Sequence, residues 1–234
     1  MAGRGVIADA PILEKQDKLY VAKNCKWVNL FRPVNPDRKF SGVCLAEKFA
    51  DLYAKEHDVE VGLIPCADGG TRIDQWLPGE VLFENAVNCA KLCQKTSTLV
   101  AILWHQGESD CNQECHASYL EKLKIVMTEL RARLGNDIPI VVGGLGDFLI
   151  NYTGICDYYH IINQKLEQFP NVMSRVAFAS AKGLTDKGDS LHFNTNSLME
   201  FGKRYYDAFK SIENSHLTKD QPENKVSITE IEKL

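Results

Sequence analysis

Thr98-Leu99-Val100-Ala101-Ile102-Leu103, followed at once by Trp104-His105-Gln106-Gly107-Glu108-Ser109-Asp110, is the stretch that decides how this chain is interpreted. The first six residues form a short apolar run without alternation, which indicates a strand buried on both faces. Such strands usually belong to parallel sheets, where ligands bind beyond the carboxyl ends of the strands. The next seven bring an imidazole, an amide and two carboxylates around a glycine. We therefore predict a functional site here; the alternative is a polar loop in which Ser109 or Asp110 caps a later helix.

Short apolar strands and amphipathic helices alternate along most of the chain. Strands are expected at residues 18–21, 59–64, 98–103, 138–142 and 176–179. Helices are expected from residue 41 onward and at residues 80–93, 116–134, 158–169 and 196–210. This alternation predicts an α/β fold of βαβ units around a parallel sheet. Residues 27–36 are interpreted as a loop with exposed aromatic side chains. We expect one domain over residues 1–212 and a polar tail over residues 213–234.

Composition narrows the class of protein. The 234 residues are 44% hydrophobic and 25% charged, which is ordinary for a globular domain, and the net charge of -4 gives no electrostatic case for nucleic acid or an anionic membrane. Residues 1–5 lack the apolar core of a signal peptide, and no apolar run approaches the ~20 residues of a membrane span. The eight cysteines are expected to be reduced, with several buried, in a cytoplasmic protein.

Two further loops carry chemistry. A Gly69-Gly70-Thr71 turn follows the strand at residues 59–64, and Asp189-Ser190-Leu191-His192 follows the strand at residues 176–179. An acid three residues before a histidine can accept a hydrogen bond from Nδ1 and leave Nε2 as a general base. The backbone N–H of Gly70 and the side-chain amide of Gln106 are suitable donors to an oxyanion. Together these groups indicate acyl transfer, with the nucleophile still unidentified.

These three motifs resemble, in the same order, those of the sialate O-acetylesterase and acetylxylan esterase group of SGNH hydrolases, over about residues 1–210. The resemblance implies a flavodoxin-like three-layer α/β/α fold that removes acetyl groups from sugar hydroxyls, without a metal or another cofactor. It implies His192 as the base, Asp189 as its partner, and Gly70 and Gln106 as the oxyanion hole. Glu108 and Asp110 would brace the loop or the site, and Trp104 and His105 would contact the sugar.

The chain departs from this family pattern at its beginning. In the family, the nucleophilic serine lies in Gly-Gln-Ser-Asn, after the first strand and directly before Met-Ala-Gly-Arg-Gly, whereas this chain opens with Met1-Ala2-Gly3-Arg4-Gly5. We therefore expect a truncated chain that lacks the central strand and its serine, has little activity, and folds poorly unless another strand fills the gap. The resemblance gives neither Ser109 nor Ser190 the role of nucleophile. Asp68 replaces an expected small residue, and it would either weaken the oxyanion pocket or point to solvent.

Two other classes of function remain as alternatives. The chain would be a non-catalytic relative if it binds sugars through residues 27–36 and Trp104. It would be a metal or redox protein if Cys111, Cys115 and His116 act together beside His105. The second alternative ranks lower because no other Cys or His pair has the spacing of metal ligands.

Overall fold

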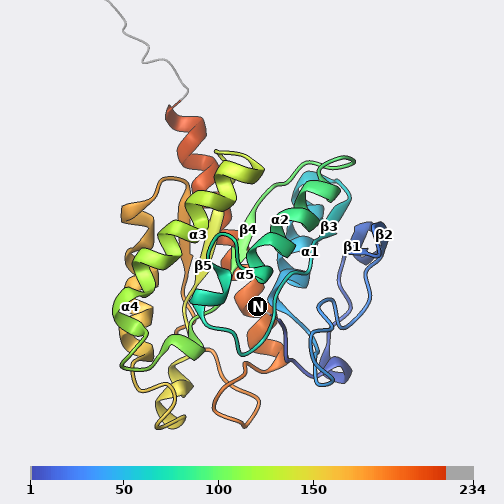
Figure 1. Cartoon of the computed structure of the whole chain (residues 1–234). Coiled ribbons are helices and arrows are strands. Elements are labelled where there is room, and N and C mark those ends of the chain that lie inside the picture. The colour runs from blue at the N-terminus through green and yellow to red at the C-terminus, as the bar shows by residue number, and fades with distance from the viewer. Residues whose placement is uncertain (1, 220–234) are drawn as a thin grey trace, which may run out of the picture.

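The computed structural model describes residues 2–219, with side chains up to residue 215. Figure 1 shows helices and strands alternating along the chain. The strands are β1 Leu19–Lys23, β2 Lys26–Asn29, β3 Val61–Leu63, β4 Ile102–Trp104, β5 Ile140–Gly143 and β6 Val176–Ala179. The α-helices are α1 Leu45–His57, α2 Val81–Cys93, α3 Tyr119–Leu134, α4 Tyr159–Val172 and α5 Thr195–Lys219. No helix in this part of the chain combines the length and apolar composition of a membrane span.

The predicted α/β/α arrangement is confirmed. Buried side chains of α2, α3 and α4 form one hydrophobic cluster with β5, and those of α1 and α5 form another. Along β5, Ile140 and Val142 belong to the first cluster and Val141 to the second, so this strand is buried on both faces. Every strand pair is parallel except β1–β2.

The strands form two sheets of three instead of one continuous sheet. Their orders are β2-β1-β3 and β4-β5-β6. In the described part of the chain β3 and β4 do not pair with each other, and a cavity of about 1210 Å³ is lined by residues of both strands. Figure 1 shows the two groups side by side.

Several predicted boundaries were wrong. The strand expected at residues 98–103 is confined to β4 Ile102–Trp104, and its first two residues are only partly buried. Trp27 lies in β2 and not in a loop, because Asn24 and Cys25 turn the chain with φ of 50° and 62°, which joins β1 and β2 in a hairpin. The last helix continues to Lys219, so residues 213–219 of the expected tail are helical. The rest of that tail, residues 220–234, lies outside the described residues.

Candidate functional site

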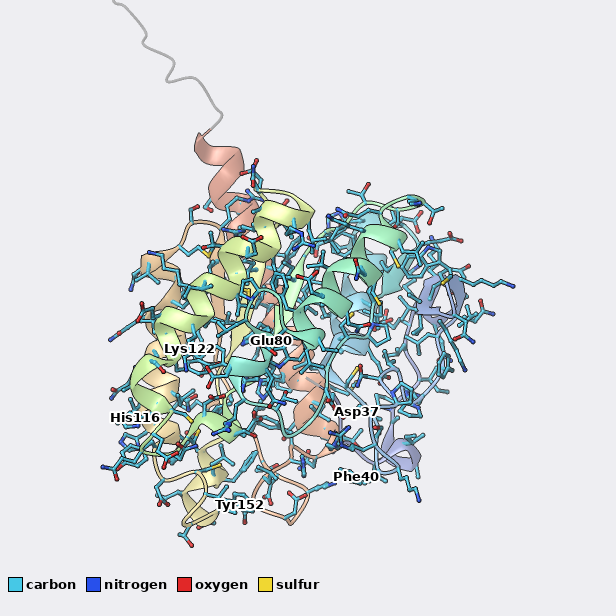
Figure 2. The ribbon with its side chains drawn as sticks, in the orientation of Figure 1. Asp37, Phe40, Glu80, His116, Lys122 and Tyr152 are labelled. Carbon is cyan, nitrogen blue, oxygen red and sulfur yellow. The ribbon has the colours of Figure 1, made fainter. Side chains whose placement is uncertain are left out.

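The three predicted loops meet at one end of the central cavity. Gly70, Gln106, Glu108 and His192 all line it. They come from the segments that follow β3, β4 and β6, so the carboxyl ends of parallel strands bring them together. Phe40 and Tyr152 also line the cavity, and Figure 2 labels them on opposite sides of this end of the molecule.

Asp189 and His192 form the hydrogen-bonded pair that their spacing predicts. Nδ1 of His192 lies 2.7 Å from Oδ2 of Asp189, and the backbone N–H of His192 donates to Oδ1 at 2.8 Å. The loop is held by Asp186, whose Oδ2 accepts from the N–H of Gly188 and of Ser190. Burial raises the pKa of Asp189, but the hydrogen bonds from His192 outweigh it and the pKa is lowered. The carboxylate therefore stays ionised and orients the imidazole.

Gln106 joins the loop after β4 to the segment after β3. Its Nε2 donates to the carbonyl oxygen of Thr71 at 3.0 Å and to Oδ2 of Asp110, which also accepts from the N–H of Ile73 at 3.0 Å. Both amide hydrogens of Gln106 thus point at protein acceptors. Burial raises the pKa of Asp110 against the effect of these hydrogen bonds. Oε1 of Gln106 and Oδ1 of Asp110 are buried and unpartnered among the described residues.

His105 and Glu108 form a second pair on the same loop. Nε2 of His105 lies 3.1 Å from Oε1 of Glu108, and the exposed fractions of the two side chains are 2% and 32%. The imidazole packs edge-on against Phe193 and Phe201. Burial raises the pKa of Glu108, but the neighbouring His105 lowers it by more, to about 2. At the cavity wall, therefore, Glu108 presents a carboxylate while most of the His105 ring lies behind it.

Trp104 holds the loop from inside the core. Its ring packs edge-on against Trp76 at 5.5 Å, and only 7% of the residue is exposed. The hydroxyl of Tyr205 donates to the carbonyl oxygen of Trp104 at 2.7 Å, and that of Tyr119 donates to the carbonyl oxygen of Gln106 at 2.6 Å. In this structure the indole stabilises the loop and offers little surface to a sugar.

An ion pair that the sequence analysis did not single out supports the glycine turn. The side chains of Arg4 and Asp37 are each 7% exposed and meet through two hydrogen bonds, and Oδ2 of Asp37 also accepts from the N–H of Gly69 at 2.9 Å. Figure 2 labels Asp37 near Phe40, at the cavity end of the molecule. Burial raises the pKa of Asp37, but the hydrogen bonds from Arg4 and Gly69 more than offset it and the pKa lies well below the usual range. Arg4 lies in the segment Met1-Ala2-Gly3-Arg4-Gly5, which the family pattern includes. Nothing in the sequence pattern indicates that Asp37 supports the site.

The turn itself leaves room for a ligand. Gly70 has φ of +79°, and no atom lies within 4 Å of the position that a Cβ would take. Asp68 also lines the cavity, but its carboxylate lies 2.7 Å from Nη1 of Arg38 and does not come within 4 Å of that Cβ position. Asn35 fixes the strand end through two hydrogen bonds with the backbone of Ala67. The Gly70 backbone is thus open to the cavity while its neighbours are held in place.

The cysteines are all free, in agreement with the expected reduced thiols. Cys111 donates to the carbonyl oxygen of Gly107 at 3.2 Å, whereas Cys115 contacts Nη1 of Arg72 at 3.7 Å. His116 stacks on Tyr158. Among residues 2–219, no group of three or more His, Cys, Asp or Glu side chains is placed to hold a metal ion.

The described residues supply no hydroxyl or thiol hydrogen-bonded to Nε2 of His192. The hydrogen bond of the imidazole goes to Asp189. Ser190 uses its backbone N–H to bond Asp186, and Ser109 uses its carbonyl oxygen to bond Asn112. Among the described residues, therefore, the imidazole of His192 is hydrogen-bonded at Nδ1, to Asp189, and no hydroxyl or thiol is bonded to Nε2.

The fold is an α/β/α arrangement of parallel strands, with a hydrogen-bonded Asp–His pair on the loop that follows β6. The chain belongs to the carbohydrate esterase, sialic acid-specific acetylesterase family, whose model matches residues 1–211. It is 28% identical over 202 residues to a probable carbohydrate esterase of Arabidopsis thaliana, which covers 82% of this chain and 74% of that protein.

Solved structures agree on the fold. The structure of that Arabidopsis thaliana protein superposes with a TM-score of 0.79 at 26% identity and covers 90% of this chain and 93% of its own. NanS gives a TM-score of 0.71 at 14% identity and covers 92% of this chain and 93% of its own. A carbohydrate acetylesterase from Xanthomonas citri gives 0.64 at 17% identity and covers 85% of this chain and 50% of its own. The last two likenesses concern the fold alone.

Proposed function

We propose that this site performs the hydrolysis of O-acetyl groups on sugars, with His192 as general base and Asp189 as the group that orients it. The observation that carries the proposal is the 2.7 Å contact between Nδ1 of His192 and Asp189, on the same cavity as the open Gly70 turn. The printed names of relatives, a probable carbohydrate esterase and a carbohydrate acetylesterase, support the substrate class.

The chemistry follows from the positions of these groups. A serine hydroxyl next to Nε2 of His192 loses its proton to that nitrogen and attacks the acetyl carbonyl carbon. The N–H of Gly70 stabilises the oxyanion of the tetrahedral intermediate. His192 then returns the proton to the sugar oxygen as the ester bond breaks, and water releases acetate from the acyl-enzyme by the same steps. No metal or cofactor takes part in this scheme.

The hydrogen bonds of Gln106 support a positioning role for this residue in place of the role of side-chain oxyanion donor. Because Nε2 donates to Thr71 and Asp110, the amide holds the loops after β3 and β4 at a fixed separation. We infer that Gln106 and Asp110 position the Gly70 turn, and that Glu108 faces the sugar.

A second candidate is a non-catalytic protein that binds acetylated sugars in this cavity. It is favoured by the lack of a hydroxyl or thiol bonded to Nε2 of His192 in the described residues. Such a protein would bind the sugar in the same cavity but would not form an acyl-enzyme or hydrolyse the ester.

Hydrolysis of a simple aryl acetate separates the two candidates. It is measured for the 234-residue chain and for a chain extended before Met1 by a strand and Gly-Gln-Ser-Asn, with circular dichroism as a check on folding. If only the extended chain turns over, and His192→Ala lowers kcat by about 10²–10⁴-fold, the esterase proposal holds. His160→Ala, on the exposed face of α4, is the matched control and leaves the rate unchanged.

Other outcomes have definite meanings. Turnover by the 234-residue chain that depends on His192 shows that a residue within it acts as nucleophile. If both chains are folded and inert, calorimetric titration with an O-acetylated monosaccharide decides for or against the binding protein.

A further inference from the structure

Two of the free thiols contact each other beside the loop that follows β4. Sγ of Cys111 lies 3.2 Å from the carbonyl oxygen of Gly107, and Sγ of Cys156 lies 3.3 Å from that of Glu108. Both sulfurs therefore lie against one short stretch of backbone, and the two thiols also hydrogen-bond to each other. Cys111 ends this loop and Cys156 precedes α4, so the tertiary fold, and not local spacing, brings the two thiols together.

Backbone hydrogen bonds hold the two cysteines in this contact. The N–H of Tyr158 donates to the carbonyl oxygen of Cys111 at 3.0 Å, and the N–H of Cys156 donates to that of Tyr152 at 3.2 Å. Both cysteines belong to the same buried hydrophobic cluster. A disulfide needs Cβ atoms about 3.5–4.5 Å apart, and sulfurs that are already in contact reach this geometry without a large movement of the backbone.

The two thiols differ in how readily they ionise. The hydrogen bond from Cys111 outweighs burial and lowers the pKa of the Cys156 thiol. The same hydrogen bond, together with burial, raises the pKa of the Cys111 thiol well above its usual range. The thiolate is the form of cysteine that peroxides oxidise. Cys156 is therefore the thiol that reacts first, and Cys111 is placed to react with the product.

Cys156 directly follows an exposed turn. Thr153 and Gly154 are exposed and Ile155 is 54% exposed, whereas Cys156 itself is 1% exposed. Exposed turns open locally at a small cost in free energy, and such an opening admits a molecule as small as hydrogen peroxide. The residue before Cys111, by contrast, is the fully buried Asp110. Access to solvent thus favours the same order of reaction.

We propose that Cys111 and Cys156 form a redox modification site, at which hydrogen peroxide converts the two thiols reversibly into a disulfide. Sγ of Cys156 attacks one oxygen of the peroxide, the O–O bond breaks, and the other oxygen takes up a proton and leaves as water. Sγ of Cys111 then attacks Sγ of the resulting sulfenic acid, the S–O bond breaks, and the hydroxyl leaves as water with the thiol proton of Cys111. The two thiols together lose two electrons, and one hydrogen peroxide is reduced to two waters.

The disulfide clamps the loop that follows β4. This loop carries Gln106, Glu108 and Asp110, which lie within a few residues of Cys111. A covalent bond to the segment before α4 replaces a contact that opens freely with one that opens only on reduction. Oxidation is therefore expected to restrict the motion of the loop. Formation of the bond does not depend on ester hydrolysis, so this proposal and the proposed function fail separately.

A second thiol pair in the chain provides an internal comparison. Cys66 and Cys89 also hydrogen-bond to each other, but burial, with Cys89 close by, raises the pKa of the Cys66 thiol to about 12. A thiol with so high a pKa is almost entirely protonated at neutral pH and reacts slowly with peroxide. This pair is expected to remain reduced while Cys111 and Cys156 are oxidised.

The test maps disulfides in the full 234-residue chain. The reduced protein is treated with hydrogen peroxide, its remaining thiols are alkylated, and its peptides are identified by mass spectrometry without reduction. We expect a Cys111–Cys156 cross-link to accumulate about tenfold or more faster than a Cys66–Cys89 cross-link, and dithiothreitol to remove it. We also expect amide hydrogen exchange at Tyr158, whose N–H bonds Cys111, to slow by about tenfold or more in the oxidised chain.

Two serine variants assign the roles of the thiols. In Cys111→Ser, oxidation of Cys156 is expected to stop at the sulfenic acid, which dimedone traps as an adduct on that residue. Cys115→Ser is the matched control, because Cys115 is also buried and close in sequence, but its sulfur contacts Arg72. This variant is expected to form the Cys111–Cys156 cross-link at the rate of the parent chain.

Mapping in the unsubstituted chain keeps the test decisive if a variant fails to fold. The proposal is overturned if peroxide yields no Cys111–Cys156 cross-link, or if a Cys66–Cys89 cross-link accumulates as fast. It is also overturned if oxidation leaves the exchange rate at Tyr158 unchanged, because the loop is then not clamped.

Discussion

Arg4 and Asp37 are joined by two parallel hydrogen bonds, Nη1 to Oδ1 at 2.8 Å and Nη2 to Oδ2 at 2.7 Å, with 7% of each side chain exposed. The same carboxylate receives the N–H of Gly69. One buried ion pair thus connects the first residues of the chain with the turn that carries Gly70. Breaking it would disturb both the stability of the fold and the turn at Gly69 and Gly70.

Removing the carboxylate of Asp37 should lower the free energy of unfolding by several kcal/mol. Asp37→Ala leaves the guanidinium of Arg4 buried without its partner, and the loss of such a partner typically costs about 3–5 kcal/mol. Urea unfolding at pH 7 measures the change. Asp68→Ala is the matched control: it removes a more exposed partner of Arg38 and is expected to cost about 1 kcal/mol or less. Equal losses in the two variants would show that the Arg4–Asp37 pair has no special role.

Glu108 should make the fold sensitive to acid. Its pKa is about 2 in the folded chain and about 4.3 in an unfolded one, so the folded state binds the proton more weakly. Stability from this group is complete above about pH 4.3 and is lost as the pH falls toward 2. Unfolding free energies of the parent chain and Glu108→Gln, measured from pH 7 to pH 2.5, should therefore converge as the pH decreases. A difference that stays constant over this range would contradict the assignment.

Tyr119 should stabilise the folded chain through the hydrogen bond that its hydroxyl donates. Tyr119→Phe removes the 2.6 Å hydrogen bond to the carbonyl oxygen of Gln106 and leaves that acceptor without this partner, at an expected cost of about 1–3 kcal/mol. Thermal unfolding reports the change. Tyr158→Phe, which keeps the ring that stacks on His116, is the comparison and should shift Tm by less. The assignment would be refuted by a Tm for Tyr119→Phe that matches the parent chain.

Much of the site could be predicted because it depends on local spacing. Asp189 and His192 are three residues apart on one loop, and local geometry alone brings their side chains together. The strands were predictable for a similar reason, since short apolar runs between amphipathic helices have few other interpretations. The meeting of three loops followed from the rule that parallel strands end at one edge.

The contributions that escaped prediction depend on distant partners. Asp37 lies 33 residues from Arg4, and its importance comes from burial, which no spacing reveals. Gln106 looked like an oxyanion donor because its amide is chemically suitable, but its donors are occupied by Thr71 and Asp110, whose positions come from the tertiary fold. Trp104 looked like a sugar contact, and its burial against Trp76 could be seen only once α2 and α3 were in place.

Gly107 should be the position in the loop least tolerant of a side chain. Its φ is +147°, and a Cβ there would lie 2.9 Å from Cγ2 of Ile162. Gly107→Ala therefore combines backbone strain of about 1–3 kcal/mol with overpacking of a similar size. Gly79→Ala is the matched control, because Gly79 has φ of +92° but open space around its Cβ position, so only the strain remains. Chemical denaturation should show the larger loss of unfolding free energy for Gly107→Ala, and equal losses would mean that the loop moves aside without cost.

If the loop moves, Gln106 and Asp110 move with it. The amide of Ile73 donates to Asp110, so its hydrogen-exchange rate reports that movement directly.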